Sequence, residues 1–135
     1  MRLQAGELGS VSPLNVMHGV PANLDLERFS GSILTQICLG EFQQQFHFAE
    51  PTLSISVEGG WEVSNAASEL VDRSLENDVR DAYRLHRLLG RSVVGHVLNP
   101  PHSFTLRFDN GWSLTVFDNS REYESFSIQP GDIFV

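Results

Sequence analysis

The chain has no lysine and only one cysteine. All nine basic residues among its 135 are Arg, so no Lys amine is present for Schiff-base or nucleophilic chemistry. A single cysteine, Cys38, excludes an intramolecular disulfide and gives no support to secretion. Because Cys38 stands in the apolar run Ile37-Cys38-Leu39, we expect an inert, buried thiol.

Long apolar runs are also missing. No segment approaches the roughly 20 apolar residues of a membrane span, and the N-terminus lacks a basic region followed by an apolar stretch. We therefore expect a cytoplasmic protein without a membrane partner. Seventeen acids against nine Arg give a net charge of −8, which disfavours nucleic acid as a direct partner and favours a basic protein.

The sequence repeats one pattern of alternating apolar residues after about sixty positions. In the second copy, the segment 104–116 alternates on both sides of Asp109-Asn110-Gly111, which predicts a β-hairpin. The matching apolar residues are Phe46, Phe48, Leu53 and Ile55 in the first copy and Leu106, Phe108, Leu114 and Val116 in the second. Two related β units are the simplest explanation.

The predicted fold is α+β and mainly β, a single domain of two tandem β-meander units with one central helix. The segment 1–22 is expected to be a loosely ordered arm, 23–72 the first meander, and 73–135 the helix with the second meander. The two apolar sheet faces are predicted to pack as a two-layer sandwich, as a barrel-like closure, or as one larger sheet that carries the helix.

The helix is predicted over 76–89. Within it, apolar and aromatic residues recur at the spacing of one buried helical face, and Gly90 provides a C-terminal stop. The residues of that face are Val79, Ala82, Tyr83, His86 and Leu89.

No pattern of catalytic or metal-binding residues is present. The chain has no Gly-x-Ser-x-Gly, no His-Glu-x-x-His and no cysteine pair, and its one Gly-Gly step, Gly59-Gly60, belongs to a predicted hairpin turn. We predict no catalytic residue, no metal and no cofactor. An enzyme that uses His96 or His102 is the weakest of three functional hypotheses.

Carboxylates concentrate in the first half, where seven acids in the first 64 residues stand against Arg2 and Arg28. Such a surface accelerates encounter with a basic protein and contributes to its specificity. The candidate partner-binding residues are Glu41, Glu50, Glu58, Glu62 and Glu124.

A pocket between the two units is the second hypothesis, with a small molecule as its ligand. Trp61-Glu62 and Tyr123-Glu124 occupy similar places in the two copies, which suggests a matched pair of ligand contacts, although packing of both aromatics in the core is the competing interpretation. The candidate lining residues are Trp61, His96, His102 and Tyr123. A homodimer is left open.

The segment 85–128 resembles a group of small bacterial proteins. The shared pattern is L-x-F-x-x-G-x-x-L-x-V, here Leu106 to Val116, followed by Tyr123-Glu124-Ser125. Small acidic proteins of this kind look like the immunity proteins of bacterial toxin systems, which bind and neutralise a cognate toxin. The resemblance implies a non-enzymatic, toxin-binding protein, and this is the leading hypothesis.

Overall fold

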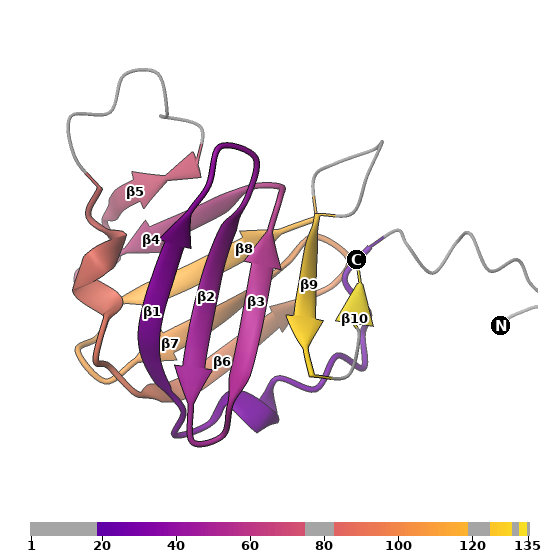
Figure 1. Cartoon of the computed structure of the whole chain (residues 1–135), viewed down its shortest axis with the longest axis horizontal. Helices are drawn as coiled ribbons and strands as arrows, with labels where there is room; N and C mark the ends of the chain where they lie inside the picture. Colours follow the sequence, from indigo (N-terminus) through magenta and orange to yellow (C-terminus); the bar gives the residue numbers. More distant parts are fainter. Residues whose placement is uncertain (1–18, 75–82, 119–124, 131–132, 135) are drawn as a thin grey trace, which may run out of the picture.

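The computed structural model describes residues 19–74, 83–118, 125–130 and 133–134. Within these ranges the strands form two antiparallel five-stranded sheets, stacked face to face with their strands crossing (Figure 1). Sheet A has the order β1-β2-β3-β9-β10, and sheet B has the order β5-β4-β8-β7-β6. The prediction of a mainly β fold is confirmed, and the two-layer sandwich is the packing observed.

The strands of sheet A are β1 (Ile33–Leu39), β2 (Gln44–Ala49), β3 (Leu53–Val57), β9 (Phe126–Gln129) and β10 (Ile133–Phe134). Those of sheet B are β4 (Trp61–Ser64), β5 (Leu70–Arg73), β6 (Val93–Asn99), β7 (Ser103–Phe108) and β8 (Ser113–Phe117). Two short 3₁₀ turns, η2 (Glu27–Phe29) and η4 (Leu85–Leu88), precede β1 and β6.

The core lies between the sheets and contains the repeated apolar residues. All eight of the matching residues predicted from the repeat are at most 4% exposed. Strands β2 and β3 alternate between buried and half-buried positions, as expected of strands with one face against a core. Burial of one such Phe or Leu side chain stabilises the fold by about 2 kcal/mol.

The two repeats exchange their last two strands, which the prediction of two separate meanders did not include. Strand β3 pairs with β9 from the second repeat, and β4 pairs with β8, so the hairpin β4-β5 belongs to the sheet of the other repeat. Each sheet is thus a three-stranded meander extended by a hairpin from the partner repeat. Neither repeat completes a sheet alone.

The chain changes sheets at Gly59-Gly60. The backbone N–H groups of Glu58 and Gly59 both donate to the carbonyl of Ser125, at 2.8 and 2.9 Å. Strand β3 ends just before this corner and β4 starts just after it in the other layer. A turn without β-branched side chains suits such a sharp change of direction.

A pseudo-twofold seam joins the beginnings of β1 and β6. At its centre Ile33 and Ser92 form an isolated antiparallel bridge. Gly31 and Gly90 stand at equivalent places with φ of +79° and +80°, a conformation that favours glycine. Four backbone hydrogen bonds surround the bridge in two matched pairs: Gly31 to Val93 with Gly90 to Leu34, and Leu34 to Arg91 with Val93 to Ser32.

The predicted hairpin at Asp109-Asn110-Gly111 is confirmed. The N–H of Gly111 donates to the carbonyl of Phe108 at 2.9 Å, and the Asn110 side chain accepts from the N–H of Trp112 at 3.1 Å. Gly111 has φ of +85°, and a Cβ there would lie 2.9 Å from that of Ala66. Only glycine fits this turn without strain.

The predicted central helix is not confirmed. Among the described residues no α-helix occurs, and 75–82 lie outside them. Tyr83 and Arg84 precede η4 without helical structure, so the C-terminal part of the prediction is wrong. Leu85 and Leu88 of η4 are buried in the core. In the other repeat, Leu26 just before η2 and Phe29 at its end are buried in the equivalent way. The spacing of Leu85 and Leu88 therefore fits one 3₁₀ turn whose two Leu side chains pack at a corner of the sandwich.

Candidate functional site

The four predicted acidic residues that the structure describes lie at three different places. Glu41 follows β1 and Glu58 follows β3, so both lie at one end of sheet A, whereas Glu50 lies at the opposite end, between β2 and β3. Glu62 is on β4 of the other sheet and is half-buried. Glu124 lies outside the described residues.

Of the four predicted pocket residues, the three that the structure describes lie in different environments. Trp61 is 1% exposed and its indole N–H donates to the Gln44 side chain at 2.8 Å. His96 is exposed on the edge strand β6, and His102 is exposed in the turn between β6 and β7. Tyr123 lies outside the described residues. For Trp61 the core interpretation holds.

The counterpart of Trp61 in the second repeat is Phe126, not Tyr123. Trp61 is paired with Val116, and Phe126 is paired with Val57 at the equivalent place. The rings of Phe126 and Phe104 pack edge to face with centroids 5.1 Å apart. The position that Phe104 fills in one repeat is filled by Gln44 in the other, so an aromatic pair replaces a hydrogen bond.

His96 instead connects the two repeats through Glu27 on η2. Its Nε2 lies 3.1 Å from a Glu27 carboxylate oxygen. This hydrogen bond is the main cause that holds the pKa of Glu27 below its usual value of 4.5. The Ser30 hydroxyl, which donates to the same carboxylate at 3.2 Å, lowers the pKa by a smaller amount. The pair is solvent-exposed, which limits its effect on stability.

A variant test follows from this pair. Replacing His96 with Phe is expected to raise the pKa of Glu27 toward 4.5, and replacing Ser30 with Ala should raise it less. Since the folded-state pKa is depressed, the stabilising contribution is present above the unfolded-state pKa and is lost as pH falls through the folded-state value. NMR titration of the Glu27 carboxyl carbon measures the change. An unchanged Glu27 titration in His96→Phe contradicts the assignment.

The most distinctive surface is the outer face of sheet A, called the neutral face below. Strands β1, β2, β3 and β9 contain no Asp, Glu, Lys or Arg. In contrast, the outward positions of sheet B include Glu62, Arg73 and Arg107. The neutral face consists of two rows paired across four strands: Gln36, His47, Ser54 and Gln129, and Cys38, Gln45, Ser56 and Ser127. Ser127, at the end of the second row, is buried.

Cys38 belongs to this face, so the prediction of a buried thiol is wrong. The register of β1 against β2 shifts between Leu34 and Gln36, which marks a β-bulge. The extra residue reverses the phase of the alternation, and Cys38 is thereby paired with Gln45 on the outer side. Its side chain is half-buried.

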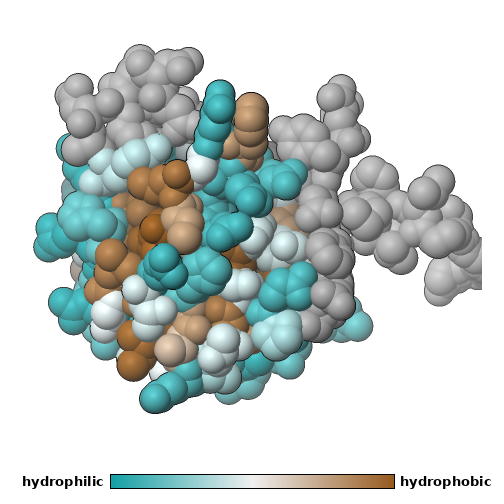
Figure 2. Space-filling view, in the orientation of Figure 1, coloured by the Kyte–Doolittle hydropathy of each residue, from teal (hydrophilic) through white to brown (hydrophobic). Residues whose placement is uncertain are grey.

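Figure 2 looks onto the neutral face. Teal and white residues cover its middle, over β2 and β3, and brown residues gather over the upper part of β1. Above this edge Phe42 is 81% exposed. A tight turn presents Phe42, since the N–H of Gly40 donates to the carbonyl of Gln43 at 2.8 Å. Sequence reasoning missed this face, although its signal was the Gln, His and Ser residues at every second position of β2 and β3.

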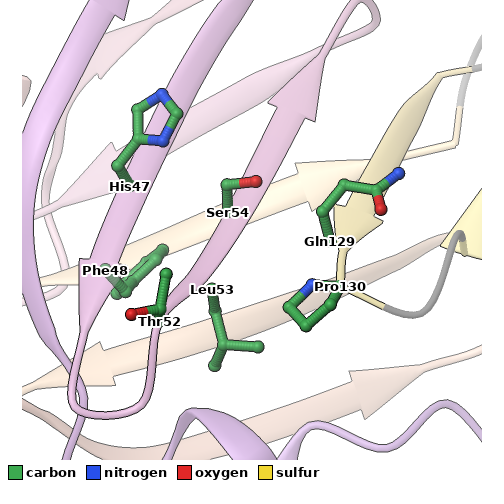
Figure 3. Close-up of a pocket in the computed structure, with 7 residues that line it drawn as sticks. All are labelled: His47, Phe48, Thr52, Leu53, Ser54, Gln129 and Pro130. Atoms are coloured by element: carbon green, nitrogen blue, oxygen red, sulfur yellow. The ribbon is translucent and has the colours of Figure 1, made fainter.

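A hollow of about 270 Å³ opens at one end of the neutral face. Figure 3 shows His47, Ser54 and Gln129 in a row across β2, β3 and β9, with Thr52, Leu53 and Pro130 beyond the row. Phe48 completes the lining. The guanidinium group of Arg28 donates to the Pro130 carbonyl and braces this edge.

The described ranges contain neither a metal site nor a membrane-spanning helix. In those ranges no three His, Cys, Asp or Glu side chains come together as a metal site. The same ranges contain no helix of the length and apolarity that a bilayer crossing requires. Comparison of the chain with protein-family models, with curated proteins and with solved structures finds no match.

Proposed function

We propose that this chain is a non-enzymatic protein-binding module that docks a basic protein, such as a bacterial toxin, on the neutral face of sheet A. The observation that carries the proposal is the absence of Asp, Glu, Lys and Arg from β1, β2, β3 and β9 in a chain with a net charge of −8. The cores of protein interfaces are depleted of charged residues, because burial of an unpaired charge is costly.

The rim of the neutral face supports a basic partner. Glu41 and Glu58 are exposed at one end of sheet A and Glu50 is exposed at the other. Carboxylates at a rim attract a positively charged partner and increase the association rate, while the uncharged centre avoids a desolvation penalty. Phe42, beside Glu41, adds an exposed aromatic side chain of the kind enriched at interfaces. The acids thus act at the edge, not as one acidic surface.

The test compares two Arg substitutions at equivalent places in the two sheets. Ser56 lies in the middle of the neutral face, and Thr115 is its counterpart in sheet B. Ser56→Arg is expected to reduce recovery of the partner from a lysate of the source organism by about tenfold or more, since it buries an unpaired charge. Quantitative mass spectrometry of the retained proteins measures the recovery.

Thr115→Arg is the matched control. It adds the same side chain to the outer face of sheet B, next to Glu62, its cross-strand neighbour. The proposal requires one basic protein that is retained by the native chain and by Thr115→Arg but lost with Ser56→Arg. Equal recovery by all three proteins contradicts docking on the neutral face.

A further inference from the structure

We propose that the hollow beside His47 is an anchor site that accepts one tyrosine side chain of the docked partner. This inference rests on the proposed function and identifies the partner group that the neutral face recognises. The hollow is continuous with the neutral face, since His47, Ser54 and Gln129 belong to both. Interfaces concentrate their binding energy in a few such pockets, which hold Trp, Tyr or Arg side chains.

The size and floor of the hollow fit an aromatic ring. Its volume of about 270 Å³ exceeds the roughly 150 Å³ of a cavity that admits benzene. Phe48 and Leu53 are 2% and 4% exposed, so they present only small apolar surfaces at the floor, and Pro130 forms an exposed side wall. Burial of a ring against these groups is favourable in proportion to the apolar area covered.

The upper lining fits a polar tip. His47, Ser54 and Gln129 place an imidazole, a hydroxyl and an amide along the row, and Thr52 adds a second hydroxyl beyond the row, beside Leu53 (Figure 3). All four have hydrogen-bonding side chains. A phenolic O–H is both donor and acceptor, and a buried Tyr normally finds such a partner. A phenylalanine anchor leaves these groups without a hydrogen-bond partner from the ligand.

The absence of carboxylates from the lining disfavours an Arg anchor. None of the seven lining residues is Asp or Glu, so a guanidinium would be desolvated without a counter-charge. Two charged residues of opposite sign stand near this edge: Arg28, whose guanidinium group donates to the Pro130 carbonyl, and the exposed Glu50 in the turn between β2 and β3. Their charges offset each other, so the edge does not favour a cation. Charge complementarity therefore selects a neutral aromatic anchor.

The experiment titrates the full chain with three neutral-backbone probes and follows backbone amide shifts by NMR. N-acetyl-L-tyrosinamide is expected to shift the amides of 47–54 and of Gln129, with a Kd of about 1 mM. N-acetyl-L-phenylalaninamide should bind about threefold or more weakly, and N-acetyl-L-argininamide should not saturate. Equal affinity for the phenylalanine probe, or tighter binding of the arginine probe, overturns the proposal.

Leu substitutions at two equivalent positions locate the site. Ser54→Leu fills the hollow and should abolish the tyrosinamide shifts, whereas Ser113→Leu, at the matching place in sheet B, should leave them unchanged. Thermal denaturation checks that both variants fold. If tyrosinamide fails to bind while Ser56→Arg still removes the partner, the anchor proposal fails and the proposed function stands. If tyrosinamide binds as expected while Ser56→Arg leaves recovery unchanged, the hollow binds a tyrosine side chain but docking of the partner on the neutral face is contradicted.

Discussion

Replacement of Trp61 with Ala is expected to lower the free energy of unfolding by about 4 kcal/mol. Trp61 is the largest of the fully buried side chains and packs between the sheets at the start of β4. Its removal leaves a large cavity at the point where the first repeat contributes its hairpin to sheet B. Urea denaturation followed by far-ultraviolet circular dichroism measures the change. A loss below about 1 kcal/mol contradicts this packing.

The hydrogen bond of Trp61 accounts for part of this effect. Gln44 is 7% exposed and accepts from the indole N–H. Gln44→Ala removes this acceptor from the buried indole N–H and is expected to lower the free energy of unfolding by about 2 kcal/mol. Gln45→Ala on the outer side of the same strand is the control, with an expected effect within about 0.5 kcal/mol.

The second repeat suggests how the loss can be recovered. There the equivalent pair is Phe104 and Phe126, whose rings meet edge to face. The double variant Gln44→Phe/Trp61→Phe is therefore expected to be more stable than the sum of its single variants predicts, because each Phe supplies the partner that the other needs. A double-mutant cycle with no coupling contradicts the equivalence of the two positions.

The substitution Asp72→Ala is expected to lower the free energy of unfolding by about 3 kcal/mol. Asp72 is 2% exposed, and one carboxylate oxygen accepts from the backbone N–H groups of Arg84 and Leu85 at 2.6 and 3.0 Å. Its other oxygen accepts from the N–H of Arg73 at 3.0 Å. Removal of the carboxylate takes the acceptor from the buried N–H of Leu85 and the part-buried N–H of Arg84, and it releases η4 from β5. Denaturant unfolding measures this loss.

Two further variants separate the charge of Asp72 from its geometry. Asp72→Asn keeps one acceptor oxygen and is expected to lose about half as much as Asp72→Ala. Asp109→Ala removes an exposed carboxylate that lies 3.7 Å from Arg91 and should change stability by less than about 1 kcal/mol. If Asp72→Ala and Asp109→Ala have equal effects, Asp72 is not an anchor.

Local pattern predicted most strands, because alternation of apolar residues is fixed by which side chains face the core. The segments around Phe46, Ile55, Leu106 and Leu114 were predicted as strands and are strands. The exchange of hairpins between sheets was not predictable in the same way. Strand β3 has an apolar inner face whether it pairs with β4 or with β9, and only the corner at Gly59-Gly60 decides between them.

The helix prediction is wrong in its described C-terminal part, because three- and four-residue spacing does not distinguish a helix from a short 3₁₀ turn. The segments 85–90 and 26–31 share Leu, Arg and Gly at matching positions, and in the structure η4 and η2 fill equivalent corners. The pocket prediction matched Trp61 with Tyr123, but the residue at the equivalent place in the second repeat is Phe126, three positions later. The Cys38 prediction failed at a β-bulge, which reverses the inward side without a change in apolar composition.

The central claim is that the neutral face of sheet A binds a partner protein. The most direct measurement is NMR mapping of the chain with the basic protein that the native chain retains and Ser56→Arg does not. Docking on the neutral face predicts that amide shifts and line broadening concentrate on β1, β2, β3 and β9, with the strongest effects around His47, Ser54 and Gln129. Perturbations confined to sheet B, around Glu62 and Arg107, would contradict it.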